Sequence, residues 1–338
     1  MKKERTNALF TVGTVLLIMT VLIGLLFIRG SAEHDNSANT VKSSNEQSIY
    51  NILLLGRDSA AGLSDVMIIV SIDTESGNTF VLQIPRDTYF NYTEDSYKKI
   101  NGAPTSQGIS AFANALGSAL GIKIDFYLSM DYDAVTQMVD ALSGVEIDIP
   151  MDMNYEDPYQ NLSIKFKAGK QLLDGKAALE FLRYRAGYVT GDLGRIDAQK
   201  LFINAFAKRI TEKKNPAIFL NLFNIIKNSG QTNIREQDIV LMGLKSAKSK
   251  GGNVYYVTAP GEAIQSSKSG AWYYVLSKES MIELLYSHLG VLKNENDFDK
   301  DAKFVDNNVK SFYDIYNKRC EYKIYSAQEI GNNEIIIN

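Results

Sequence analysis

Residues 183–199 read RYRAGYVTGDLGRIDAQ and place three arginines within thirteen positions, around a glycine-containing turn. The preceding residues 174–182 predict a helix, because Asp174 can cap the first turn and apolar residues recur at helical spacing. Residues 196–210 predict a second helix with an apolar face. A guanidinium group offers a planar fork of donors that matches phosphate oxygens. The hairpin is therefore either a phosphate site or a solvated, salt-bridged pair of helices, and residues elsewhere decide between them.

Strands and helices alternate in the chain before this hairpin. The apolar run at 49–56 ends in glycine and predicts a buried strand, whereas 144–150 alternates strictly, as a half-exposed strand does. Further strands are predicted at 66–72, 79–84 and 126–130, and helices at 110–120 and 132–142. The alternation favours the α/β class, with a three-layer α/β/α domain built on a mixed central sheet.

The composition narrows the classes of function. The chain has 338 residues, of which 45% are hydrophobic and 22% charged, and its net charge of -3 argues against a nucleic-acid partner. The composition also argues against a metal centre built from cysteine or histidine. The chain has a single cysteine, Cys320, and its two histidines, His34 and His288, are far apart in the sequence. A metal would have to be held by carboxylates, which favours magnesium, manganese or calcium.

Residues 8–28 form an uncharged apolar run that would span about 31 Å as a helix, enough to cross a bilayer. Lys2, Lys3 and Arg5 precede the run, so the positive-inside rule puts the N-terminus in the cytoplasm and the rest of the chain outside. A cleaved signal peptide is the alternative, but the run is longer than usual and no convincing cleavage site follows. We therefore expect a single-pass signal anchor, followed by a flexible linker at 29–48.

A second polar constellation lies far upstream of the hairpin. Asp58 and Asp65 flank a short loop between two predicted strands, at a place where open α/β sheets bind ligands. Aspartates also cap turns very commonly, which is the alternative interpretation. Two carboxylates beside many basic residues suit a magnesium-pyrophosphate site, because the metal and the guanidinium groups share the phosphate charge. The basic residues are Arg57, Arg86, Lys98, Lys99, Arg183, Arg185 and Arg195.

Taken together, these motifs resemble the LytR–CpsA–Psr family of cell-wall glycopolymer ligases, over roughly residues 50–289. The resemblance lies in short motifs that occur in the family's order: 51–58, 64–67, 84–89, 99–101, 140–145, 169–175, 183–185 and 191–195. It implies an α/β/α core that transfers an anionic glycopolymer from a polyprenyl-pyrophosphate carrier to peptidoglycan. The implied organisation is a cytoplasmic tail at 1–7, the anchor at 8–28, the linker at 29–48, a catalytic domain at 49–290 and a C-terminal appendage at 291–338.

The resemblance also implies roles for individual residues. Asp58 and Asp65 would hold Mg²⁺ or Mn²⁺. The pyrophosphate would be bound by Arg57, Arg86, Lys99, Arg183, Arg185, Arg195 and Gln199, and the residues placed in catalysis are Arg86, Arg183, Arg185, Asp192 and Arg195. The carboxylate that orients or deprotonates the attacking hydroxyl is either Asp192 or Asp87. The chain departs from the family at Leu63 and Ala198, where relatives often carry arginine.

These observations predict a transferase at the bacterial cell membrane, with its folded domain outside the cell. Its partners would be the lipid-linked glycopolymer, peptidoglycan and the membrane. Two alternatives use the same residues: a binding or regulatory protein without catalysis, and a lipid pyrophosphatase that releases the polymer to water. The glycopolymer itself is left open by the sequence.

Overall fold

The computed structural model describes residues 47–58, 62–93, 97–158, 162–213, 215–246 and 252–335. The predicted tail and signal anchor, and most of the predicted linker, lie outside the described residues. Among the helices within the described ranges, none is long and apolar enough to cross a membrane.

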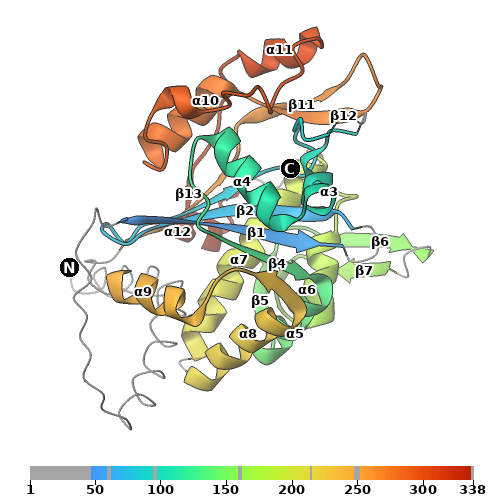
Figure 1. Ribbon diagram of the computed structural model, residues 1–338. Coiled ribbons are helices and arrows are strands. Elements are labelled where there is room, and N and C mark those ends of the chain that lie inside the picture. Colours follow the sequence, from blue (N-terminus) through green and yellow to red (C-terminus); the bar gives the residue numbers. More distant parts are fainter. Residues whose placement is uncertain are drawn as a thin grey trace, which may run out of the picture.

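Seven strands form the central sheet (Figure 1). In order across the sheet they are β13 (Tyr325–Ser326), β10 (Val254–Thr258), β3 (Thr79–Gln83), β2 (Ser64–Asp73), β1 (Ile49–Arg57), β4 (Phe126–Asp131) and β9 (Gly230–Thr232). Strand β1 runs parallel to β4, and β3 runs parallel to β10, whereas the other neighbours are antiparallel. The predicted mixed sheet is confirmed. Because β2 is antiparallel to both β1 and β3, the carboxyl ends of β1, β3, β4 and β10 share one edge with the start of β2.

Helices cover both faces of this sheet, as the three-layer prediction requires (Figure 1). Successive strand residues point to opposite faces, so Leu53 and Leu55 join one buried cluster while Ile52 joins the other. The first cluster is completed by α3 (Ala103–Gln107), α4 (Ile109–Leu120), α10 (Lys278–Ile282) with its π-helical continuation (Glu283–His288), and α11 (Lys310–Tyr316). The second is completed by α5 (Tyr132–Ala141), α6 (Gly175–Arg183), α7 (Asp192–Lys213), α8 (Pro216–Ser229), α9 (Glu236–Ser246) and α12 (Ala327–Gly331).

Three antiparallel hairpin-like sheets lie outside the central one. They pair β5 (Val145–Ile149) with β8 (Gly169–Leu173), β6 (Met153–Asp157) with β7 (Leu162–Phe166), and β11 (Gly261–Gln265) with β12 (Trp272–Leu276). The strand predicted at 144–150 is present as β5, and its residues alternate between buried and exposed. Short 3-10 turns occupy Ile100–Gly102 and Glu295–Asp297.

The C-terminal segment differs from the separate appendage predicted over 291–338. Its aromatic residues Phe298, Phe304 and Phe312 are buried in the same cluster as the first face of the sheet, and β13 extends the sheet beside β10. These apolar residues are irregularly spaced in a polar stretch, so no helical or strand period marks them as core. The segment described from 291 to 335 is therefore part of the folded domain.

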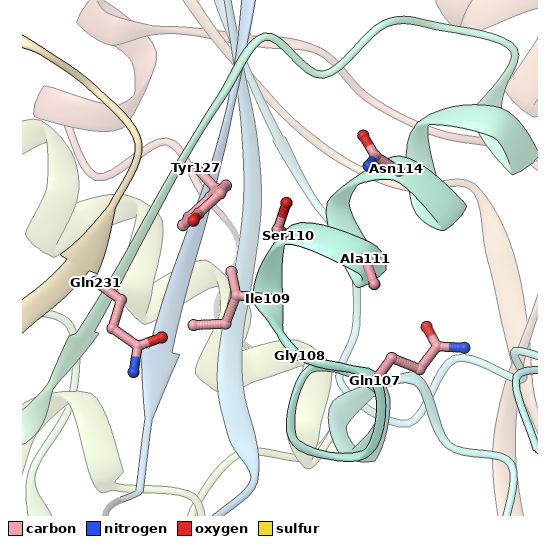
Figure 2. Close-up of a pocket in the computed structure, with 8 residues that line it drawn as sticks. All are labelled: Gln107, Gly108, Ile109, Ser110, Ala111, Asn114, Tyr127 and Gln231. Carbon is pink, nitrogen blue, oxygen red and sulfur yellow. The ribbon is translucent and has the colours of Figure 1, made fainter.

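A pocket of about 530 Å³ opens where α4 begins, next to β4 and the edge strand β9 (Figure 2). Helix α4 starts after Gly108, which takes a φ of 83°, a value that glycine adopts readily. The chain turns sharply there from α3 into α4, and this turn forms one wall of the pocket.

Candidate functional site

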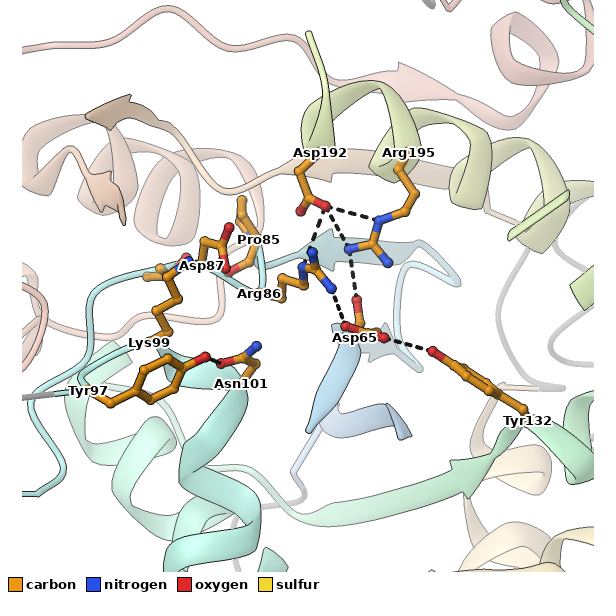
Figure 3. A network of polar contacts seen from close by, with 11 residues as sticks. Asp65, Pro85, Arg86, Asp87, Tyr97, Lys99, Asn101, Tyr132, Asp192 and Arg195 are labelled. Carbon is orange, nitrogen blue, oxygen red and sulfur yellow. Dashed lines mark hydrogen bonds and ion pairs between the residues drawn. The ribbon is translucent and has the colours of Figure 1, made fainter. Parts of the chain in front are cut away.

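Two carboxylates and two guanidinium groups meet at the sheet edge where β1 and β3 end and β2 begins (Figure 3). Asp65 is the second residue of β2, and Arg86 follows β3 after Ile84 and Pro85. Asp192 and Arg195 come from the first turn of α7, so a helix far along the chain closes the cluster from the other side. The two loops that the sequence singled out are thus brought together by the fold.

The four groups are held by short, charge-assisted contacts. Arg86 Nη1 lies 2.5 Å from Asp65 Oδ1, and Arg86 Nε lies 3.5 Å from Asp192 Oδ1. Arg195 Nε donates to the same Asp192 oxygen at 3.1 Å, and Arg195 Nη2 lies 3.0 Å from that oxygen. Arg195 Nη2 also donates to the backbone carbonyl of Asp65 at 3.3 Å. Asp192 Oδ2 is buried and accepts no hydrogen bond within the described chain. Arg86 Nε is also buried without a hydrogen-bond partner, so the cluster retains one unsatisfied acceptor and one unsatisfied donor.

Asp65 also accepts a hydrogen bond from the Tyr132 hydroxyl, at 2.7 Å from Oδ2. Burial of Asp65 favours its neutral form, but the Tyr132 hydrogen bond and the charges of Arg86 and Arg195 outweigh it and lower its pKa. Burial and the nearby carboxylates Asp65 and Asp58 raise the pKa of Tyr132, so its hydroxyl stays a donor. The lowered pKa keeps Asp65 charged beside it.

Sequence reasoning did not identify Tyr132 as a site residue. It is the first residue of α5, directly after β4. The signal was available in the topology alone, because β4 is parallel to β1 and ends at the same edge as Asp58. Nothing in the residue itself distinguishes it from an ordinary core tyrosine.

Arg183 is connected to the site through a contact with the Tyr132 ring. Helix α6 is capped by Asp174, as predicted, and ends at Arg183, after which Tyr184 takes an extended conformation (φ -61°, ψ 136°). Two arginines separated by one residue can approach a common ligand only if the backbone straightens between them, and the backbone does so here. The Arg183 guanidinium carbon lies 5.7 Å from the centre of the Tyr132 ring. Arg185 is exposed, and no described contact ties it to the cluster.

Lys99 and Asp87 form a neighbouring ion pair rather than joining the four-residue cluster. Lys99 Nζ lies 3.0 Å from Asp87 Oδ1 and 6.0 Å from the centre of the Tyr273 ring. Asp87 directly follows Arg86 in the chain. Burial lowers the pKa of Arg86, but the negative charges of Asp192, Asp65 and Asp87 outweigh this effect and raise it. Lys98 turns away and donates to Asn91 at 2.6 Å.

Gln199 and Arg57 lie at the margins of the cluster. Gln199 is buried on α7 and accepts a hydrogen bond at 3.3 Å from Gln83, the last residue of β3, while its own Nε2 has no partner in the described chain. Arg57 ends β1 directly opposite Ser64, the residue after Leu63, and its buried Nε is likewise unpaired. Arg57 thus brings a positive charge next to the position where relatives often carry arginine. Ala198 is fully buried, so no ligand contact is made there.

The carboxylate oxygens of Asp58 and Asp65 are suitable ligands for a hard divalent cation that takes only a few of its ligands from the protein. Both residues lie close enough to Tyr132 to raise its pKa, and each Asp65 oxygen accepts one hydrogen bond, which leaves acceptor capacity on the carboxylate. No group of three or more His, Cys, Asp or Glu side chains that could enclose a metal occurs in the described ranges. Magnesium is commonly bound in this way, by one or two carboxylates completed by water and phosphate.

Comparisons with known proteins agree with the sequence motifs. The model of the LytR_cpsA_psr family matches residues 23–288. The chain is 31% identical over 195 residues to the polyisoprenyl-teichoic acid–peptidoglycan teichoic acid transferase TagV of Bacillus subtilis, a match that covers 55% of this chain and 50% of that protein. It is also 28% identical over 306 residues to TagU of Oceanobacillus iheyensis, which is named as a transferase of the same kind. That match covers 82% of this chain and 92% of TagU.

The fold comparison points the same way. The crystal structure of Bacillus subtilis TagV matches with a TM-score of 0.60 at 24% identity, covering 73% of this chain and 98% of that one. At that level of identity the likeness establishes the mixed α/β fold and nothing about the ligand.

Proposed function

This chain belongs to the LytR–CpsA–Psr family, and from that premise we propose that it attaches an anionic glycopolymer to peptidoglycan, taking it from a polyprenyl-pyrophosphate carrier. Relatives that bear the name of teichoic acid transferases support the reaction class. The observation that carries the proposal is the cluster of Asp65, Arg86, Asp192 and Arg195, in which two guanidinium groups pair with two carboxylates and Asp192 Oδ2 has no hydrogen-bond partner.

The proposed step is a phosphoryl transfer. A hydroxyl oxygen of the acceptor attacks the phosphorus nearest the sugar, and a new O–P bond forms while the bond to the bridging oxygen breaks. The bridging oxygen leaves with the bonding electron pair as polyprenyl phosphate, and the hydroxyl proton passes to a carboxylate. The transition state spreads charge over the phosphoryl oxygens, so fixed positive groups account for most of the rate enhancement.

Arg86 and Arg195 are the residues we assign to that charge. Their side chains are already oriented by Asp65 and Asp192, so they need little rearrangement when the reacting oxygens become more negative. Arg183, resting on the Tyr132 ring, and the exposed Arg185 would close on the pyrophosphate from the α6 side. Lys99, Arg57 and Gln199 would lie farther out and contribute to binding.

We assign Asp58 and Asp65 as the residues that would hold Mg²⁺ or Mn²⁺. The ion would supply charge neutralisation at the pyrophosphate oxygens. We favour Asp192 over Asp87 as the base, because Asp192 lies between Arg86 and Arg195, whereas Asp87 pairs with Lys99 outside the four-residue cluster. Asp192→Asn should therefore impair transfer more than Asp87→Asn.

We further propose that residues 8–28 anchor the protein in the membrane with the domain outside the cytoplasm. A reporter enzyme that is active only outside the cytoplasm, fused after Asn338, should be active. Activity of a reporter that works only in the cytoplasm would contradict this orientation.

The test of the function is a transfer assay with full-length protein in detergent, a lipid-pyrophosphate-linked glycopolymer and peptidoglycan fragments. The expected result is covalent polymer–peptidoglycan product in equal amount to polyprenyl phosphate. Polymer released without attachment would identify a pyrophosphatase instead. Tight donor binding with neither product would favour a binding or regulatory protein.

A further inference from the structure

The pocket beside the start of α4 is lined by uncharged side chains (Figure 2). Its hydrogen-bonding members are three carboxamides and two hydroxyls: Gln107, Asn114, Gln231, Ser110 and Tyr127. In Figure 2, Tyr127 and Gln231 form one wall, and Ile109 and Ser110 form the facing wall. Within the described chain, the side chains of Ser110, Asn114, Tyr127 and Gln231 make no hydrogen bonds to other residues.

This lining selects a class of ligand by its chemistry. With no charged side chain among the lining residues, the pocket offers nothing to neutralise a phosphate or a carboxylate. A lipid tail would also be a poor occupant, since it would cover the carboxamides without satisfying them. Carboxamides and hydroxyls both donate and accept, as sugar hydroxyl groups do, and Tyr127 with Ile109 offers apolar surface to a ring face. An uncharged sugar meets all of these requirements.

The pocket is connected to the catalytic cluster by a short rigid element. The backbone N–H of Asn101 donates to the Arg86 carbonyl at 3.2 Å, and the Thr105 hydroxyl donates to the Gly62 carbonyl, in the loop between Asp58 and Asp65. Helix α3 then ends at Gln107, in the wall of the pocket. Residues 101–107 span about 10 Å at helical rise, so a glycan in the pocket can extend to the cluster.

We propose that this pocket is a subsite for the uncharged part of a glycan chain, which it holds while the pyrophosphate lies at the Asp65–Arg86 cluster. The proposal rests on the proposed function for the identity of the glycan, and two sources supply the same chemistry. One is the acceptor glycan of peptidoglycan, and the other is a neutral sugar of the lipid-linked donor.

The direct test is calorimetric titration of full-length protein with chitohexaose, an uncharged oligosaccharide, and separately with poly(glycerol phosphate), a charged polymer. The double variant Asn114→Ala/Gln231→Ala removes two uncharged hydrogen-bonding groups, so chitohexaose should bind about 10-fold or more weakly. Ser110→Trp should weaken it by filling the pocket. All three positions are exposed, and unchanged thermal unfolding would exclude misfolding. Gln328→Ala, an exposed carboxamide on the opposite face of the sheet, is the matched control and should bind normally.

Unchanged chitohexaose affinity in both pocket variants would overturn the proposal, as would a loss confined to poly(glycerol phosphate). The titration does not depend on turnover, so it stands even if the transfer assay fails. Where transfer is measurable, the same variants should raise the KM of one substrate. A rise for the peptidoglycan fragment identifies the acceptor as the source, and a rise for the lipid-linked donor identifies the donor.

Discussion

The arginines of the site fall into two groups that are held in different ways. The side chain of Arg195 is 6% exposed and that of Arg86 is 21% exposed, and both lie against Asp192. Arg183 instead rests on an aromatic ring, and Arg185 is exposed to solvent. A charged group that is fixed before the reaction stabilises developing charge at no reorganisation cost, whereas an exposed arginine must be ordered by the substrate. We propose that the first group stabilises the transition state from fixed positions, whereas the second group is ordered by the pyrophosphate before it acts.

Replacement of the paired arginines by lysine should have the largest effect. Arg86→Lys and Arg195→Lys keep the charge but lose the planar fork that bridges carboxylate and substrate. Transfer should slow by about 10²–10³-fold, the range for removal of one preorganised donor. Arg235→Lys, at an exposed ion pair with Asp238, is the matched control and should leave kcat unchanged. Retention of more than about a tenth of the wild-type kcat in Arg86→Lys would show that the pairing with Asp65 is only structural.

Arg183→Lys sharpens the comparison from the other side. If Arg183 acts on the transition state, the variant should bind lipid pyrophosphate nearly normally yet have a barrier higher by about 2–4 kcal/mol. Arg185→Lys should change kcat by less than about 5-fold, because the exposed side chain is ordered only by substrate. Equal losses in binding and in turnover for Arg183→Lys would instead show that Arg183 binds the substrate and the transition state equally strongly.

The sequence predicted the fold well where strands carry a clear hydrophobic period. The mixed sheet, the Asp174 cap and the strand at 144–150 are all confirmed. The C-terminal segment was not predicted, because Phe298 and Phe304 are buried in a cluster with residues distant in sequence, such as Phe90, and not by any local pattern.

Much of the candidate site followed from the sequence, because several arginines and aspartates fall near predicted strand ends, where open α/β sheets bind ligands. The fold does bring Arg86, Asp192 and Arg195 together around Asp65. The pairing inside the cluster was not predictable, since it depends on where α7 docks against the end of β3. Tyr132 was missed for the same reason: only the parallel register of β4 with β1 carries it to Asp65.

The metal prediction compares Asp58, which we assign as a metal ligand, with Asp87, which we do not. Asp58→Asn keeps the shape of the side chain and removes its charge, so manganese should bind about 10-fold more weakly in the presence of pyrophosphate. Asp87→Asn is the matched control, because Asp87 is engaged by Lys99 and is not among the proposed ligands. Electron paramagnetic resonance of free Mn²⁺ measures both variants. Equal affinities in wild type and Asp58→Asn would remove Asp58 from the metal site.

The smallest expected effect, from Tyr132→Phe, tests what joins the two groups of arginines. The variant keeps the ring beneath Arg183 but removes the hydrogen bond to Asp65, whose pKa should then rise toward its unfolded value. Because the folded pKa of Asp65 is depressed, its ionisation stabilises the fold above the unfolded pKa, and this contribution is lost as pH falls through the folded pKa.

Tyr132→Phe should therefore lower the free energy of unfolding by about 1 kcal/mol at pH 7, with the difference from wild type vanishing in acid. Tyr97→Phe is the control: it loses a hydrogen bond of 2.9 Å to the neutral Asn101, so its effect should not vary over the same acid range. Urea unfolding from pH 7 down to pH 3 measures both. If the two variants show the same flat pH dependence, Tyr132 does not tune Asp65, and Arg183 is connected to the carboxylate cluster only through packing on the ring.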